Sequence, residues 1–348
     1  MSYLVVDAAF LACPRPSDLP ANEQRTVIGS YVSRLADLSR LRTTCRSTVF
    51  LRDEQLPLAL HEIGSYPFRA SLSEALALCA EHFEIQVEDV NRLANFLLER
   101  SDLIEDLGEF RDVVVGDCSV APALKLDPDP RLVTQLTRMV ALVALAKHNL
   151  GRGAENMFLA TALSAEGRGE LSFELGVTLA ERHDGLIVEP AEPLIINLPV
   201  HADTTEYLRS LDLLALIQSG TAEAIIDSCI ACAAREDSDP VARAEVLAST
   251  MTIGKDFLSS ALRLGFLHES GKIQKLLRAC ADILLGRNLG KSHHLRSGKG
   301  GNDPQRTRGD FGAWRHDLDD EFHLHYWRSG DALEFANVVV HNDFDITY

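Results

Sequence analysis

The chain has 348 residues, of which 46% are hydrophobic and 24% are charged, and these ordinary globular values exclude a disordered chain. Its length is large for one hydrophobic core, so we expect two or three domains. No apolar stretch is long enough to span a bilayer, and the first residues lack the basic leader of a secretory signal. We therefore predict a cytoplasmic protein without membrane contact.

Charge is unevenly distributed along the chain. Residues 271–348 hold 11 basic and 11 acidic residues, so the formal net charge of −17 lies on residues 1–270. The basic residues of the last segment gather mainly before Trp314. A locally basic loop can hold a polyanion, and the acidic body can recognise a protein partner.

The pattern of residues 1–125 predicts an N-terminal α/β domain. Acids at the ends of buried strands often serve metal or phosphate chemistry, so Asp7 and Asp117 form a candidate pair of the kind that a PIN-type nuclease uses. The alternative is that each acid simply forms a turn. The predicted elements are a strand over 3–7, a helix over 22–41, a strand over 48–51, helices over 72–83 and 87–99, and a buried strand over 112–117.

Residues 131–268 predict a second domain, which is helical except for a small antiparallel sheet. Consecutive X-Pro steps over 126–130 indicate a linker before it, because the residue before a proline avoids the helical conformation. The predicted elements are a helix over 131–150, strands within 171–198, and helices over 204–217, 221–234 and 241–266.

Residues 271–348 predict a third domain that concentrates groups able to bind or move protons. Both tryptophans and six of the twelve histidines lie there. We expect a helix over 272–286, a glycine-rich basic loop, and strands over 311–318, 321–328 and 333–341. The fold class is therefore α+β, with several domains: a mostly helical body and a small C-terminal helix with an antiparallel sheet.

This last segment resembles the RelE-type bacterial toxins, in particular the YoeB-like branch, which are ribosome-dependent mRNA endonucleases. The likeness begins at Gly298-Lys299-Gly300, continues through Phe311-Gly-Ala-Trp314 with Arg315, and passes Glu321 and Leu324-x-Tyr326. It ends in a strand that runs into His341, and the spacings match without a gap. The resemblance implies a RelE-like α+β domain over residues 271–348.

The resemblance also implies roles in metal-free RNA cleavage. His341 falls on the proton-donating histidine, His323 on an arginine beside the phosphate, and Tyr326 on a strand tyrosine. The family's glutamate base falls on Pro304, so Asp303 is the nearest substitute, with His294 or His325 as others. Arg315 is the basic residue that follows the shared tryptophan, and with these residues it completes the expected catalytic set.

The residues themselves indicate a similar site. Period-two alternation places Glu321, His323 and His325 on one face of a strand, and the next antiparallel strand can present His341 beside them. The basic residues Lys299, Arg306 and Arg308 are candidate phosphate contacts, and Trp314 or Trp327 is a candidate stacking platform. The alternative is an exposed hairpin on which the histidines are merely polar alternates.

We therefore expect a metal-independent endoribonuclease or RNA-binding effector, of toxin or phage-defence type, that acts on RNA or the ribosome and uses no cofactor. One alternative is a non-catalytic interaction or scaffold protein of a defence complex. Another is a metal-dependent hydrolase that uses His323, His325 and His341 with an acid as ligands.

Overall fold

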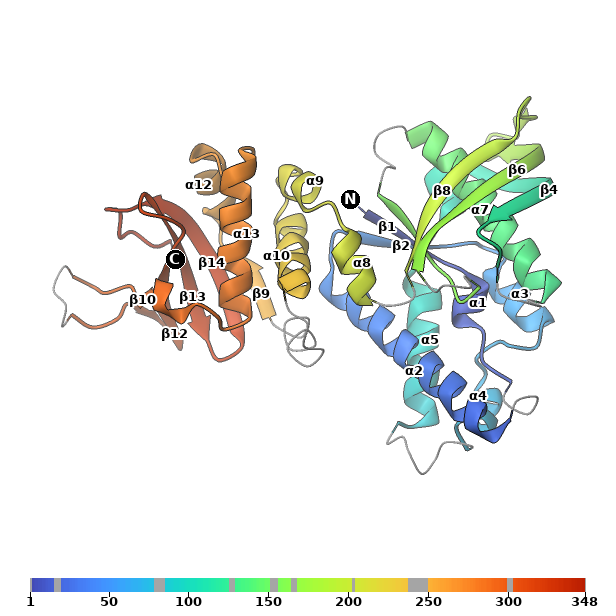
Figure 1. Ribbon diagram of the computed structural model, residues 1–348, viewed down its shortest axis with the longest axis horizontal. Helices are drawn as coiled ribbons and strands as arrows, with labels where there is room; N and C mark the ends of the chain where they lie inside the picture. The colour runs from blue at the N-terminus through green and yellow to red at the C-terminus, as the bar shows by residue number, and fades with distance from the viewer. Residues whose placement is uncertain are drawn as a thin grey trace. The chain divides into compact units, whose positions relative to one another are not determined.

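The computed structural model describes residues 2–15, 20–77, 85–124, 129–150, 156–163, 168–201, 204–236, 250–298 and 303–347. The chain divides into two compact units: unit 1 comprises Met1–Arg42 and Thr48–Tyr207, and unit 2 comprises Thr43–Ser47 and Leu208–Tyr348. Each unit combines helices with a β-sheet (Figure 1), so the predicted mixture of α and β structure is confirmed. None of the helices in these ranges is long and apolar enough to cross a membrane.

Unit 1 is built on an eight-stranded sheet with the order β3-β2-β1-β5-β8-β6-β4, in which β7 also pairs with β6. Five neighbouring strands, β3, β2, β1, β5 and β8, are parallel to one another. Strand β6 pairs antiparallel with β8, and β4 pairs antiparallel with β6. Every residue of β1 is buried, as expected for a central parallel strand between layers of helices. The apolar side chains of α7 and of the sheet form one core.

The elements of unit 1 follow the chain in this order: β1 (Ser2–Val6), α1 (Ala8–Leu11), α2 (Ala21–Thr44), β2 (Thr48–Arg52), α3 (Leu56–Glu62), α4 (Arg69–Ala77), α5 (Val87–Arg100), β3 (Asp102–Leu103), α6 (Ile104–Gly108), β4 (Phe110–Ala121), α7 (Pro130–Leu150), β5 (Met157–Ala160), β6 (Arg168–Arg182), β7 (Ile187–Val188) and β8 (Leu194–His201). Helix α8 (Thr204–Ser210) begins in unit 1 and ends in unit 2.

The sheet crosses the boundary that the sequence predicts between domains 1–125 and 131–268. Strands β5, β8 and β6 come from the second of these segments but lie between β1 and β4 of the first. The antiparallel sheet predicted within 171–198 is therefore one end of a larger sheet. Pairing between distant segments leaves no local pattern, so the sequence does not reveal this arrangement of strands. Residues 126–128 of the predicted linker lie outside the described residues.

The two acids predicted as a pair, Asp7 and Asp117, do not meet. Asp7 is buried directly after β1, whereas Asp117 lies exposed in β4. Three strands separate β1 from β4, which at the usual strand spacing is about 19 Å. Strand β4 is also a mostly exposed edge strand rather than the buried strand predicted over 112–117, and its register shifts against β6 protect this edge from further pairing.

The carboxyl group of Asp7 is held inside unit 1 by two hydrogen bonds. Its Oδ1 accepts a hydrogen bond from the Phe10 amide at 2.8 Å, and its Oδ2 accepts one from the Thr161 hydroxyl at 2.5 Å. Burial raises the pKa of Asp7 to about 7, because these bonds and the Arg34 charge only partly offset the loss of hydration.

This raised pKa makes unit 1 less stable as the pH rises. An unfolded aspartate has a pKa of about 3.9, so between that value and the folded-state pKa the free energy of unfolding falls by about 1.4 kcal/mol per pH unit. Asp7→Asn cannot ionise; its Oδ1 can still accept from the Phe10 amide, and its Nδ2 can donate to the Thr161 hydroxyl oxygen in place of the bond that Oδ2 accepts. We expect its free energy of unfolding, relative to wild type, to rise by about 2 kcal/mol between pH 5 and pH 6.5. Urea unfolding followed by far-UV circular dichroism measures this difference, and parallel pH profiles for the two proteins would contradict it.

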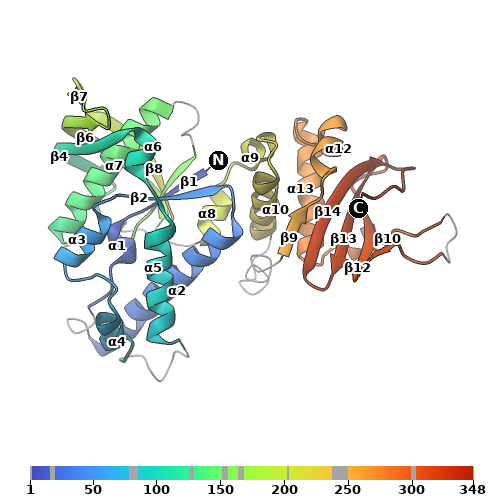
Figure 2. The same ribbon diagram turned by 180° about the vertical axis from the view of Figure 1, so that it is seen from behind.

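Unit 2 contains a six-stranded sheet, of which β10, β12, β13, β14 and β9 lie side by side in this order (Figure 2). The sixth strand, β11, pairs with β12. The three strands predicted over 311–341 are confirmed as β12, β13 and β14, which pair antiparallel. The elements of unit 2 are α9 (Leu213–Gln218), α10 (Ala222–Glu236), β9 (Thr250–Ile253), α12 (Phe257–Arg263), α13 (Ser270–Leu284), a 3-10 turn η3 (Leu289–Lys291), β10 (Ser292–His294), β11 (Thr307–Arg308), β12 (Phe311–Asp317), β13 (Phe322–Ser329) and β14 (Ala332–Val340).

The helix predicted over 241–266 is different in the structure. Residues 241–249 lie outside the described residues, Thr250–Ile253 forms β9 parallel to β14, and α12 begins only at Phe257. The β-branched side chains of Thr250, Thr252 and Ile253 favour a strand. Gly254 then ends it in close contact with the β14 backbone, because a Cβ there would lie 3.1 Å from Phe335 O.

The two faces of the unit 2 sheet are covered differently. On one face, Phe257 and Phe266, which lie in and just after α12, pack against the sheet residues Phe335 and Phe322 with ring centroids 6.2 and 5.3 Å apart. The opposite face carries the odd-numbered side chains of β13. It is covered by residues 341–347, which we call the C-terminal segment.

Candidate nucleic-acid interface

Buried side chains of β13 hold the C-terminal segment by its main-chain carbonyl groups. Because side chains alternate along a strand, His323, His325 and Trp327 point to the same face of the sheet. Each places a ring nitrogen within hydrogen-bonding distance of a different carbonyl oxygen. The contacts are His323 Nε2 to His341 O (3.2 Å), His325 Nδ1 to Asp345 O (3.0 Å) and Trp327 Nε1 to Thr347 O (2.9 Å).

His323 and His325 therefore help to hold the C-terminal segment against the sheet. Both residues are buried, which contradicts the alternative of polar alternates on an exposed hairpin. The second nitrogen of His323, Nδ1, lies 2.9 Å from Asp317 Oδ1, so both of its ring nitrogens face protein acceptors. Burial lowers the pKa of His323 and lowers that of His325 to about 4, so the His325 ring is neutral near pH 7.

The other residues of the expected catalytic set are only partly brought together. His341 is exposed just after β14, and its ring centroid lies 4.7 Å from that of His323. Tyr326 points to the opposite face of the sheet, where its hydroxyl donates to Ser292 Oγ at 3.2 Å. Asp303 lies against Gly298 at the base of the basic loop, and its carbonyl accepts a hydrogen bond from Arg296 at 2.6 Å.

The three alternative metal ligands do not form a metal site. His323 and His325 each direct a ring nitrogen at a carbonyl of the C-terminal segment rather than toward one shared point with His341. Across the described ranges, no group of three or more His, Cys, Asp or Glu side chains is arranged to hold a metal ion. The hydrolase alternative thus lacks its ligand set.

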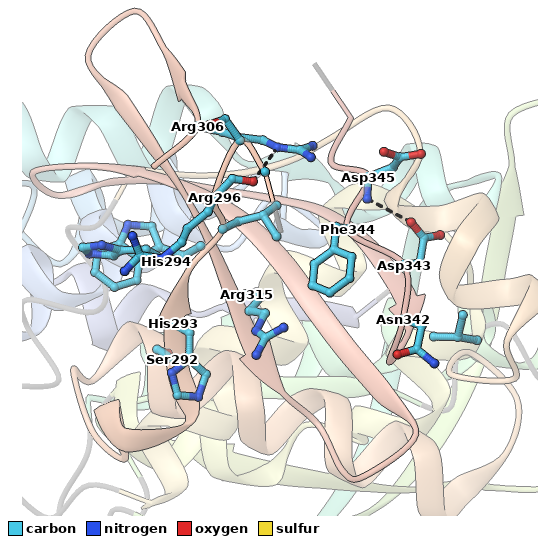
Figure 3. A pocket seen from close by; sticks show the side chains of 15 residues that line it. Ser292, His293, His294, Arg296, Arg306, Arg315, Asn342, Asp343, Phe344 and Asp345 are labelled. Carbon is cyan, nitrogen blue, oxygen red and sulfur yellow. Dashed lines mark hydrogen bonds between the residues drawn. The ribbon is translucent and has the colours of Figure 1, made fainter. Parts of the chain in front are cut away.

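A cleft of about 1470 Å³ lies beside these residues in unit 2 (Figure 3). One wall is formed by residues 292–298 together with Arg306, Trp314 and Arg315, and the other by Val340 and residues 342–345. Four residues predicted for the site therefore line it: His294, Arg306, Trp314 and Arg315. The His294 ring stands edge-on to the Trp314 ring at 4.3 Å, and the register places this pair, with Tyr326, on the face of the sheet opposite Arg315.

The predicted cations have different environments. Arg308 is paired with Glu334 at 2.6 Å and lies over the Trp327 ring. Its charge is therefore already neutralised by an acidic partner within the fold. Arg306 lines the cleft, where its Nε donates to the Arg296 carbonyl at 2.9 Å. Lys299 lies outside the described residues.

Arg315 is the least satisfied of these cations. Its Nε is buried without a hydrogen-bond partner, and the guanidinium has no carboxylate partner within the described ranges. The group lies 5.9 Å from the Phe344 ring centroid, and Figure 3 shows it between His293 and Phe344. A partly buried guanidinium without an anion is suited to a carboxylate or phosphate ligand.

His293 is a cleft residue to which the sequence analysis gave no role. It pairs with Arg315 across β10 and β12, so the two side chains are neighbours on one face. Its Nε2 lies 3.5 Å from Asp317 Oδ2, while the other oxygen of Asp317 contacts His323. The short strand β10 lies in a polar, glycine-rich stretch without alternation, so only the pairing reveals this neighbourhood.

The cleft carries a local positive charge on a strongly acidic chain. Its lining contains three arginines, Arg296, Arg306 and Arg315, against two aspartates, Asp343 and Asp345, with His293 and His294 as further groups that can take up a proton. No protein-family model, curated protein or solved structure matches this chain.

Proposed function

We propose that unit 2 binds single-stranded RNA in this cleft. The observation that carries the proposal is Arg315, whose guanidinium is partly buried beside two further arginines and has no acidic partner within the described ranges. Phosphate groups supply the missing anion. The Phe344 ring, beside Arg315, offers a surface on which an unpaired base stacks, which favours a single strand over a duplex. The resemblance of residues 298–341 to RelE-type toxins supports the same ligand.

Arg315→Gln tests this proposal directly. Removing a charged hydrogen-bonding group costs about 1.5–3 kcal/mol, so we expect the affinity for a fluorescein-labelled 12-nucleotide RNA to fall roughly 10- to 100-fold. The slope of log affinity against log salt concentration should fall by about 0.7, the value for one phosphate contact on a single strand. Fluorescence anisotropy at several salt concentrations measures both quantities.

Arg308→Gln is the matched control for that experiment. It removes the same charge from the same region, but Arg308 is already neutralised by Glu334. We expect its RNA affinity and salt slope to stay close to those of wild type. Equal losses in the two variants would mean that only general charge attracts RNA, and no binding by the wild-type chain would favour the scaffold alternative.

A second candidate function, metal-independent RNA cleavage, is supported by the Asp317 carboxylate, which contacts both His293 and His323. With Nε2 of His293 turned to Asp317, Nδ1 is left to accept a proton. In this reaction Nδ1 takes the proton of a ribose 2′-hydroxyl, and O2′ attacks the adjacent phosphorus. The bond from phosphorus to O5′ breaks, and O5′ takes a proton from solvent. Arg315 stabilises the charge that develops on the phosphate oxygens.

The products of that reaction are a 2′,3′-cyclic phosphate and a 5′-hydroxyl end. Incubating wild-type protein with RNA in the presence of EDTA, with and without ribosomes, separates the two candidate functions. Cleavage with these ends supports the endoribonuclease, and binding without cleavage in either condition supports an RNA-binding effector. In both cases the chain would suit an effector of toxin or phage-defence type.

A further inference from the structure

The second wall of the cleft is acidic, which a phosphate site alone does not explain. Asp343 and Asp345 face the wall of three arginines, and a carboxylate repels a phosphate that approaches it. A ligand suited to both walls has one anionic edge and another edge rich in N–H donors. A nucleotide has this division, because its phosphate is anionic and its base presents N–H groups.

Asp345 is held in place by its main chain. Its amide donates to Asp343 Oδ1 at 2.9 Å, and its carbonyl accepts from His325 Nδ1 and from Asn337 Nδ2, each at 3.0 Å. The next side chain, Ile346, is buried in a small core with Trp327. The backbone that carries the Asp345 side chain is thus fixed on both sides.

The carboxylate of Asp345 itself remains available. It has no hydrogen-bond or ion-pair partner in the part of the chain that the structure describes, and the residue is exposed. The neighbouring Phe344 ring is 42% exposed, which leaves ring surface for a stacked base beside this acceptor. An aromatic surface and a two-oxygen acceptor on a fixed backbone together make a base-reading site.

We propose that Asp345 selects guanine in the bound RNA, an inference that rests on RNA binding as the proposed function. Guanine alone presents two adjacent donors, N1–H and the N2 amine, to the two oxygens of one carboxylate. Cytosine and adenine offer a single amine on this edge, and uracil offers only N3–H. A good bidentate pair of this kind discriminates between bases by about 10- to 100-fold in affinity.

The test compares three 12-nucleotide RNAs: U12, U12 with one central guanosine, and U12 with inosine at that position. Inosine keeps N1–H and lacks the N2 amine. We expect the wild-type chain to bind the guanosine RNA at least 10-fold more tightly than U12, and the inosine RNA to lose most of this gain. Asp345→Asn should remove the preference, so that it binds the guanosine RNA and U12 with equal affinity. Asp331→Asn, which changes an exposed hairpin-turn acid, should leave the preference unchanged.

The outcomes separate this inference from the function on which it rests. Equal affinity of wild type for all three RNAs overturns guanine selection and leaves RNA binding intact, as does a preference that persists in Asp345→Asn. Failure of every RNA to bind wild type overturns both. Tryptophan emission reports whether each variant keeps the Trp327 environment, so a misfolded variant is recognised before its affinity is interpreted.

Discussion

Replacing Arg138 by methionine is expected to lower the free energy of unfolding of unit 1 by about 3–5 kcal/mol. The guanidinium of Arg138, on α7, contacts Asp53 and lies 3.1 Å from Glu105 and 3.2 Å from Asp112. Asp53 and Glu105 are buried, and burial together with the Asp53 charge raises the pKa of Glu105. Methionine retains much of the side-chain volume but leaves two buried carboxylates without a countercharge.

The pH dependence of this loss identifies its cause. Without Arg138, the buried acids must be protonated for unit 1 to fold, so the loss should be larger at pH 8 than at pH 5. Urea unfolding followed by far-UV circular dichroism detects it. Both tryptophans lie in unit 2, so the transition followed by tryptophan emission reports on unit 2 separately.

Arg131→Met provides the comparison for Arg138→Met. Arg131 lies in the first turn of the same helix and pairs with Asp129 at 2.8 Å, but this pair is largely exposed. Its removal should leave the unfolding transition unchanged within error, because exposed ion pairs contribute little. A similar loss in both variants, or none in Arg138→Met, would contradict the role assigned to the buried cluster.

If unit 2 cleaves RNA, His293→Gln is expected to reduce the cleavage rate by about 10²–10³-fold while RNA affinity stays within a few-fold of wild type. The reason is that glutamine keeps a polar side chain in the cleft but cannot take a proton from the ribose hydroxyl, and general base catalysis contributes about 10²–10⁴-fold. Single-turnover cleavage of a labelled RNA measures the rate, and anisotropy measures the affinity separately.

His341→Gln distinguishes the cleft from the site that the family resemblance implies. His293 lines the cleft and His341 does not, and the strands that carry them, β10 and β14, are three strands apart, about 14 Å. We expect His341→Gln to retain most of the cleavage rate. If His341→Gln abolishes cleavage and His293→Gln does not, the proton-donating role carried by the resemblance is correct and the cleft mechanism is wrong.

Alternation and turn chemistry were sufficient to predict three of the six strands of unit 2, but not β9, β10 or β11. The period-two pattern over 311–341 gives β12, β13 and β14, and it places His323 and His325 on one face, as the structure has them. The pattern does not show what covers that face. Residues 342–347 have neither helical nor strand periodicity, so their position over the histidines depends on tertiary hydrogen bonds that a local pattern does not encode.

The limits of sequence-based prediction in unit 1 have a similar cause. The short apolar runs that become β1 and β2 were recognised because buried parallel strands are uniformly hydrophobic. Their neighbours in the sheet come from much later in the chain, and nothing in a run such as Met157–Ala160 specifies which strand it joins. For this reason Asp117 was assigned to the same edge as Asp7, although β4 lies at the far side of the sheet.

The contacts between β13 and the main chain of the C-terminal segment affect which mutations this segment can accept. His323, His325 and Trp327 contact peptide oxygens, and every amino acid supplies a peptide oxygen. Apart from Asp343, whose side chain accepts a hydrogen bond from the Asp345 amide, the side chains of residues 342–345 therefore contribute little to the course of this segment. Mutations in this segment can replace one exposed side chain by another without changing the backbone conformation. Ligand preference in this scaffold can thus be retuned, by natural drift or by a protein engineer, without rebuilding the fold beneath it.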